Sequence, residues 1–252
     1  MTAVQGASVD VQTSDGVADA YFVHPADGAA HPAVLVYTDA FGLRPVVRAF
    51  ADDLAAQGYT VLVPNLFYRA GSAPVLELPG YIDTSVRHDV FDSIRPLIAA
   101  LTPATAISDA GAYLDFLAAA PQAAPGPVGI AGYCMGARLG LRTAAAYPDR
   151  VAAVGCFHGG NLANDAPDSP HLEVGAITAE LYFGHADQDP SLPPAQIERL
   201  EQALQTAGVR YAAEVYPGAH HGYTQPDTAA YNAEAADRHR TALLALFERT
   251  LK

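Results

Sequence analysis

The pattern of hydrophobic and polar positions divides the chain into alternating strands and helices. Apolar runs, several of them unbroken as in strands buried on both faces, predict strands. These predicted strands occupy residues 33–40, 59–66, 127–133, 151–159, 179–187 and 211–218. Helical spacing between the runs predicts helices over residues 45–57, about 86–100, 105–120, 135–146, 194–206 and 229–251. Because strands alternate with helices, we expect an α/β fold with a mostly parallel central sheet and helices on both faces.

Two regions depart from this alternation. Residues 7–25 alternate apolar and polar side chains about an Asp15-Gly16 turn, which predicts an antiparallel hairpin. Residues 70–104 are the least regular part of the chain, and we expect them to cover a pocket. No stretch is rich enough in Gly, Ser or Pro to act as a linker, so residues 1–252 are expected to form a single domain.

Composition and charge narrow the classes of function. The 252 residues carry 27 acidic and 14 basic side chains, with no basic cluster, which argues against nucleic acids or anionic membranes as partners. The longest apolar runs are too short to cross a bilayer, and the N-terminus lacks the pattern of a signal peptide. The two cysteines, Cys134 and Cys156, do not make a disulfide framework, so we expect a reducing, cytoplasmic location. Metal-type ligands do not cluster around either cysteine, and we expect neither a metal nor a cofactor.

The first candidate for chemistry is the segment "GYCMG" around Cys134, at the predicted end of a strand and start of a helix. A nucleophile between two glycines in that context is typical of a nucleophile elbow, in which a sharp turn lifts the side chain above the sheet. Gly132 and Gly136 lack Cβ atoms and allow close packing at the turn. The following helix directs its positive end at the sulfur, which favours thiolate, and leaves the backbone N–H of Met135 free for an oxyanion. Cys156 lies within a predicted strand and is expected to be a buried structural residue.

A thiol nucleophile of this kind needs a histidine base, and the base needs an orienting carboxylate, both later in the chain. His220 and His221 follow the last predicted strand, and we take His221 as the base because Gly222 gives it room to approach. Asp187 and Asp189 lie at the end of the preceding strand. We favour Asp187 because it is closer to the strand end, and Asp189 remains the alternative.

With these residues placed, the chain resembles the dienelactone hydrolase family of α/β hydrolases along nearly its whole length. The motifs that carry the resemblance are "YTDAFGL" (37–43), "GYCMG", "GHAD" and "AHHGY". The cysteine in the elbow, in place of serine, is the most specific of them. The resemblance implies an α/β-hydrolase fold and a cofactor-independent hydrolase of a carboxylic ester or lactone, of the carboxymethylenebutenolidase type.

The resemblance also implies a role for each matched position. Cys134 attacks the carbonyl and forms an acyl-enzyme. His221, oriented by Asp187, takes the proton and later activates water. The backbone N–H groups of Ala40 and Met135 correspond to the oxyanion hole of the family.

The match is weaker at the positions that contact the thiol and the substrate. Asp39 matches a family glutamate that helps to deprotonate the thiol, but its side chain is one methylene shorter. Its contact with the thiol is therefore looser, or Asp39 serves another purpose, such as capping the helix after Pro45. The family binds a substrate carboxylate with two arginines, and Arg69 is a candidate for one of them. The second arginine of the family follows the catalytic histidine by four residues, and this chain has Gln225 there. One anchor for the substrate carboxylate is therefore missing, or another residue such as Arg87 supplies it. A non-catalytic, ligand-binding relative is the alternative function, and the substrate and oligomeric state stay open.

Overall fold

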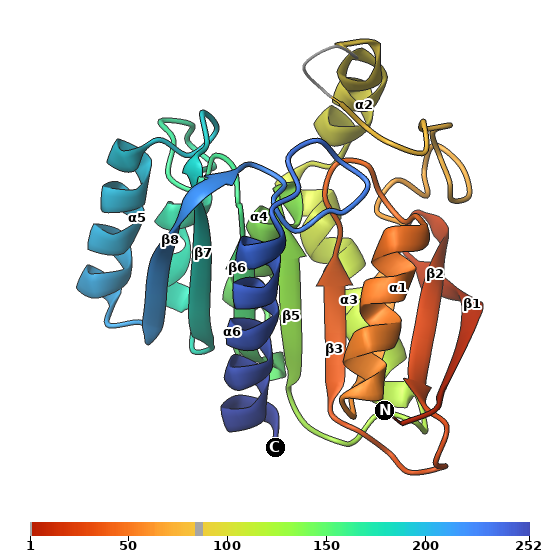
Figure 1. Cartoon of the computed structure of the whole chain (residues 1–252). Coiled ribbons are helices and arrows are strands. Elements are labelled where there is room, and N and C mark those ends of the chain that lie inside the picture. The colour runs from red at the N-terminus through yellow and green to blue at the C-terminus, as the bar shows by residue number, and fades with distance from the viewer. Residues whose placement is uncertain (1, 84–87) are drawn as a thin grey trace.

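A computed structural model gives the structure of the protein and describes residues 2–83 and 88–252 (Figure 1). Its strands are β1 (Val4–Thr13), β2 (Gly16–Pro25), β3 (Ala33–Tyr37), β4 (Thr60–Pro64), β5 (Val128–Tyr133), β6 (Val151–Phe157), β7 (Glu180–Gln188) and β8 (Tyr211–His220). Its α-helices are α1 (Pro45–Ala56), α2 (His88–Ala100), α3 (Pro103–Ala119), α4 (Met135–Ala146), α5 (Pro194–Ala207) and α6 (Ala233–Leu251). Short 3₁₀ helices are η1 (Pro148–Arg150), η2 (Pro170–Leu172) and η3 (Val174–Ala176).

The described strands form one eight-stranded sheet in the order β1-β2-β4-β3-β5-β6-β7-β8. β2 runs antiparallel to both β1 and β4, and the remaining neighbouring pairs are parallel. The N-terminal hairpin pairs Thr13 with Gly16 across its turn, as the Asp15-Gly16 pattern predicts. The mostly parallel sheet expected from the sequence is therefore confirmed, with the hairpin added at one edge.

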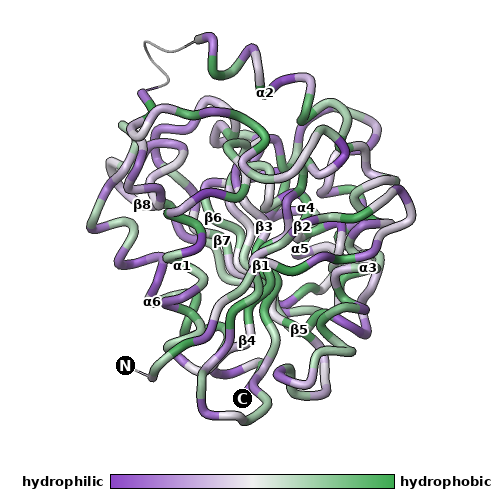
Figure 2. The backbone as a smooth tube through the Cα atoms, turned by 90° about the vertical axis from the view of Figure 1, so that its right-hand side faces the viewer, coloured by the Kyte–Doolittle hydropathy of each residue, from purple (hydrophilic) through white to green (hydrophobic). Residues whose placement is uncertain are grey.

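Helices cover both faces of the sheet, as expected. Figure 2 shows the sheet from its edge, with α1 and α6 on one side and α3 and α5 on the other. The central strands are apolar throughout because successive side chains point to opposite faces: Val34 and Val36 join the core under α1 and α6, whereas Leu35 joins the core under α3 and α4. Among the described residues, no single helix has the length and apolar character to cross a membrane; Asp89–Ala100 and Pro103–Ala119 meet that test only as a pair, which is bent by 79°.

The two strands that lead to the predicted base and acid are longer than the sequence suggests. β7 runs to Gln188 and β8 to His220, one and two residues beyond the predicted ends, because Gln188 pairs with His220. A register shift after Ala186 accompanies this extension. The residues that leave the sheet at this edge are therefore shifted along the chain relative to those expected.

Helix ends also differ from the predicted bounds. The closing helix begins at Ala233 and not at residue 229, because the Asn232 side chain caps it by accepting a hydrogen bond from the Ala235 N–H at 3.1 Å. The start expected near residue 86 lies outside the described residues, so α2 is described only from its position 88 onward. These changes leave the order of elements as predicted.

The carboxyl ends of the parallel strands meet at one edge of the sheet, the upper edge in Figure 1, and α2 lies above that edge. Both ends of the chain lie at the opposite edge. Ligands of open α/β sheets bind at the carboxyl edge. The fold therefore brings the ends of β3, β5, β7 and β8 together at the place where chemistry is expected.

Candidate active site

Cys134 occupies the turn between β5 and α4, as the elbow pattern predicts. Its φ of 55° and ψ of −114° lie where residues other than glycine are strained. The turn forms because strand and helix pack without side chains between them. A Cβ on Gly132 would lie 2.4 Å from the backbone oxygen of Gly136, and a Cβ on Gly136 would lie 2.3 Å from that of Tyr37. Both glycines are therefore needed for the cysteine to stand above the sheet.

Cys134 lines a cavity of about 590 Å³ at the carboxyl edge. Ile82, Phe91 and Ile98, from the irregular segment expected to cover a pocket, contribute apolar side chains to its wall. Cys156, in contrast, is buried in β6, where desolvation raises the pKa of its thiol far above the ordinary value. The two cysteines thus differ as the sequence predicts, one at a cavity and one in the core.

His221 follows β8 and lines the same cavity. Its Nδ1 lies 2.7 Å from Asp189 Oδ2 and 3.2 Å from Ser191 Oγ. Burial disfavours the charged imidazole, but the charges and hydrogen bonds of Cys134 and Asp189 outweigh burial and raise the pKa of His221 to about 10. Near neutral pH the favoured state is therefore a protonated imidazole between a sulfur and a carboxylate. The neighbouring His220 is exposed.

The carboxylate on His221 belongs to Asp189, which corrects the preference for Asp187. Asp189 is the first residue beyond the extended β7, and its buried carboxylate also accepts hydrogen bonds from the N–H and hydroxyl of Ser191 at 2.8 and 2.6 Å. Burial raises the pKa of Asp189, but these bonds and that of His221 hold it below the ordinary value. Asp187 is still within the strand and exposed, and its Oδ2 accepts from the Gly218 N–H at 3.0 Å.

The two residues whose backbone N–H groups are expected to form an oxyanion hole lie in the wall of the same cavity. Ala40 and Met135 both line the cavity with Cys134. In the described part of the chain, neither N–H donates to a backbone acceptor outside its own helix or strand. Met135 is also the first residue of α4, where the helix supplies no acceptor for it. Their role as an oxyanion hole stays a prediction.

Asp39 lies in the cavity wall, but another side chain engages its carboxylate. Arg44 donates from Nη1 to Oδ1 at 2.7 Å and from Nη2 to Oδ2 at 2.9 Å. Arg44 also donates to Asp227 at 2.7 Å and to Gln225 at 3.1 Å. The expectation that Asp39 helps to deprotonate the thiol is not supported, because both of its oxygens are occupied in a buried network. Nor does Asp39 cap α1, whose N-cap residue is Arg44.

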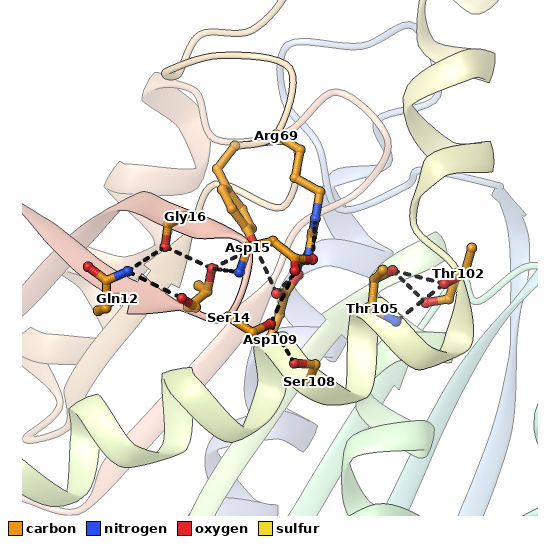
Figure 3. Close-up of polar contacts among 11 residues, drawn as sticks. Gln12, Ser14, Asp15, Gly16, Arg69, Thr102, Thr105, Ser108 and Asp109 are labelled. Carbon is orange, nitrogen blue, oxygen red and sulfur yellow. Dashed lines mark hydrogen bonds and ion pairs between the residues drawn. The ribbon is translucent and has the colours of Figure 1, made fainter.

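Arg69 does not line the cavity, which corrects its expected role as a substrate anchor. Figure 3 shows its guanidinium directed at Asp15 and Asp109. Its Nη2 lies 2.6 Å from Asp15 Oδ2, and its Nη1 lies 2.7 Å from Asp109 Oδ2. These pairs tie the loop after β4 to the hairpin turn and to α3, so the charge is balanced within the protein. Arg87, the other arginine considered, lies outside the described residues.

Ser191 and Arg138 are among the cavity-wall residues that the sequence analysis did not anticipate. Ser191, which bonds both Asp189 and His221, lies in a turn-rich stretch and carries no motif. Arg138 also lines the cavity. Its signal in the sequence is its position in the first turn of the helix that follows the predicted elbow.

His158, at the end of β6, packs beside the candidate base. Its ring centroid is 5.3 Å from that of His221, and its Nε2 lies 2.8 Å from Thr224 Oγ1. Burial, and then the charge of His221, lower the pKa of His158 well below the ordinary value, so this ring stays neutral. Within the described ranges, no three His, Cys, Asp or Glu side chains gather to hold a metal ion.

Comparison with known proteins relates this geometry to one family. Residues 18–251 match the sequence model of the Dienelactone hydrolase family. A Synechocystis protein, provisionally named a carboxymethylenebutenolidase, is 30% identical over 235 residues that cover 92% of each chain. The carboxymethylenebutenolidase of Rhodococcus opacus is 27% identical over 228 residues, covering 87% of this chain and 83% of its own. A Klebsiella pneumoniae structure, provisionally described as a dienelactone hydrolase, has a TM-score of 0.84 at 22% identity. The match covers 98% of this chain and 100% of that structure, and it supports the predicted fold.

We expect Gly136→Ala to destabilise the protein by about 1–3 kcal/mol or more, because the new Cβ meets backbone atoms of β3 that cannot move aside. Urea unfolding measures this loss. Gly175→Ala is the control, since nothing lies within 4 Å of a Cβ there, and its stability should stay within about 0.5 kcal/mol of the wild type. A Gly136→Ala protein as stable as the wild type would show that the elbow does not require close packing.

The raised pKa of His221 is open to direct measurement. In NMR titrations of protein labelled at histidine, the His221 signal, assigned by its absence in His221→Gln, should titrate near pH 10 and not near 6.5. Asp189→Asn should lower that pKa because it removes a negative charge that favours the imidazolium, whereas Asp187→Asn should leave it unchanged. A wild-type value near 6.5 contradicts the assigned contacts.

Proposed function

Because this chain belongs to the dienelactone hydrolase family, we propose that it cleaves a carboxylic ester or lactone through an acyl-enzyme on Cys134. One observation supports the proposal most strongly: Cys134, His221 and Asp189 reach one cavity from the ends of three different strands. The sulfur is on a strained elbow, the imidazole is beside it, and the carboxylate bonds the Nδ1 of the imidazole. This is the arrangement that an activated nucleophile requires. The proposed reaction uses no cofactor.

In the first step, the Cys134 thiolate, paired with protonated His221, attacks the carbonyl carbon of the substrate. As the C–S bond forms, the carbonyl electron pair moves to oxygen, where the N–H groups of Ala40 and Met135 stabilise the charge. The intermediate then collapses, the C–O bond breaks, and His221 donates its proton to the leaving alkoxide. With a lactone, the hydroxyl released in this way stays attached to the acyl chain.

In the second step, water hydrolyses the thioester. The now neutral His221 takes a proton from a water molecule whose oxygen attacks the acyl carbon, and Asp189 stabilises the imidazolium that forms. Breakage of the C–S bond releases the carboxylic acid and restores the thiolate beside protonated His221. Ser191, which donates to Asp189, keeps the carboxylate in the orientation that holds the ring.

The nucleophile is tested by comparing the two cysteines. Cys134→Ala should lower turnover of 4-nitrophenyl acetate by about a thousandfold or more, since no acyl-enzyme can form. Cys156→Ala, in the core, should keep the activity of the folded fraction. Mass spectrometry should show that iodoacetamide alkylates Cys134 first. If the wild type binds esters without turnover and Cys134 resists alkylation, the chain is instead a non-catalytic relative.

The choice of carboxylate is tested by a matched pair of variants. Asp189→Asn should lower kcat/KM for the same ester by a factor on the order of 100 to 10,000, because the imidazole loses its orienting charge. Asp187→Asn, two residues away and exposed, should change kcat/KM less than about twofold. The reverse order of effects would return the role to Asp187.

A further inference from the structure

One buried cation, Arg44, holds the turn that carries a proposed oxyanion donor. The side chain of Arg44 is only 6% exposed. In the turn 39–42, between β3 and α1, it donates to both carboxylate oxygens of Asp39, at 2.7 and 2.9 Å, and to the backbone oxygen of Gly42 at 3.2 Å. Ala40, in the same turn, lines the cavity, whereas Arg44 does not. An effect of Arg44 on the reaction therefore passes through the residues that it holds.

The hydrogen bonds of the turn limit the direction of the Ala40 N–H. This N–H and the carbonyl of Asp39 belong to one planar peptide unit, and in a trans peptide they point in opposite directions. The Asp39 carbonyl oxygen accepts from the Gly42 N–H at 3.1 Å and from the Thr38 hydroxyl at 3.1 Å. Since Arg44 holds the carboxylate at the start of the turn and the Gly42 carbonyl at its end, it restricts rotation of this peptide.

The loop between β8 and α6 (221–232), in blue at the upper edge in Figure 1, is the anchor for Arg44. Arg44 donates to the two carboxylate oxygens of Asp227, at 2.7 and 3.2 Å, and to Gln225 Oε1 at 3.1 Å. The loop is itself fixed to the sheet, because the buried Tyr223 donates from its hydroxyl to a backbone oxygen of β7 at 3.0 Å. Arg44 thus fastens the turn to a loop that is already held in place.

The candidate base has supports of its own. The ring of His221 lies 2.7 Å from Asp189 and 3.2 Å from Ser191, and both of these residues follow β7. The partners of Arg44 lie in the turn and in the later part of the loop. The oxyanion donor on the turn and the base are therefore held by different side chains.

The cost of burying charges indicates what this network does. Burial lowers the pKa of Arg44, but the charges and hydrogen bonds of Asp39 and Asp227 outweigh burial and raise it, so the guanidinium stays charged. Apolar side chains in place of a buried ion pair often leave a protein equally stable, whereas loss of one partner is strongly destabilising. The network is therefore a poor source of stability, but it favours a single geometry, because other arrangements leave a buried charge unpaired.

We propose that Arg44 is a positioning residue for the oxyanion hole: by fastening the turn 39–42 to the loop after β8, it keeps the Ala40 N–H directed at the substrate oxygen. The inference rests on the proposed hydrolase function and adds to it the residue on which one oxyanion donor depends. Arg44 contacts no substrate and transfers no proton. Asp39 then acts as the handle by which Arg44 holds the turn.

The test compares a reaction that needs an oxyanion hole with one that does not. Attack of the Cys134 thiolate on 4-nitrophenyl acetate places negative charge on the carbonyl oxygen. Alkylation of the same thiolate by iodoacetamide displaces iodide and places no charge on a carbonyl oxygen. Release of 4-nitrophenolate measures the first rate, and mass spectrometry of the Cys134 peptide measures the second.

Two variants and one matched control are compared with the wild type. Arg44→Lys keeps the charge but lacks the fork that reaches both segments. Arg44→Met combined with Asp39→Asn removes both charges, so no carboxylate of the turn is left unpaired. Arg48→Lys is the control, because Arg48 lies one turn further along α1 and its guanidinium is 5.0 Å from the centre of the Tyr21 ring. Thermal unfolding confirms that each protein is folded.

We expect both Arg44 variants to lower kcat/KM for the ester by about tenfold to a hundredfold, somewhat less than the loss of an oxyanion donor outright. The rate of alkylation should stay within about twofold, because the thiolate and His221 keep their contacts. Arg48→Lys should match the wild type in both reactions. An equal fall in both rates would show that Arg44 acts on the thiol or the base, and an unchanged ester rate would also overturn the proposal.

Amide hydrogen exchange, measured by NMR, keeps this proposal separate from the hydrolase function. The N–H groups of Phe41 and Gly42 both donate to Asp39, at 2.9 and 3.1 Å. Their exchange should be faster in Arg44→Lys by about tenfold or more, and unchanged in Arg48→Lys. Faster exchange would show that Arg44 holds the turn even if the wild type turned over no ester, an outcome that counts against hydrolysis. Unchanged exchange would overturn the positioning role and leave the hydrolase function standing.

Discussion

The close approach of β5 and α4 at the nucleophile elbow is the contact on which the rest of the site depends. With no Cβ on Gly132 or Gly136, backbone packs directly on backbone, and Cys134 is held at a φ of 55° that it would not otherwise adopt. The strain is sustained because the strand before it and the helix after it are both anchored in the core. Once the elbow is set, the N–H of Met135 lies at the first position of α4, beside the sulfur, where the helix supplies no acceptor for it.

The distribution of charge around the cavity follows from the cost of burying ions. Asp39 is neutralised by Arg44, and Asp189 by protonated His221, so each carboxylate of the wall has a cation in contact. His158, which has no carboxylate partner, stays neutral. Protonated His221, beside the sulfur, suits a reaction that develops negative charge on oxygen.

Much of the fold was predictable because its signals are local. Unbroken apolar runs identify central strands of a parallel sheet, and a glycine-flanked cysteine between a strand and a helix identifies the elbow without knowledge of any partner. The ends of elements were less predictable. The length of β7 depends on pairing between Gln188 and His220, which lie far apart in the sequence, and that pairing moves the exit of the strand from Asp187 to Asp189. No sequence pattern within either strand predicts this pairing.

The sequence by itself therefore predicted the α/β architecture and brought Cys134 and His221 forward as candidates, because each prediction depends on periodicity or on residues adjacent in the chain. Which aspartate bonds His221, and which arginines are consumed by ion pairs, was settled only by packing between distant segments. Arg69, in the loop after β4, meets Asp109 of α3, and Arg44 meets Asp227 at the sheet edge, so neither is free for a substrate. A guanidinium pairs with whatever carboxylate the fold brings within reach, and that choice is made in three dimensions.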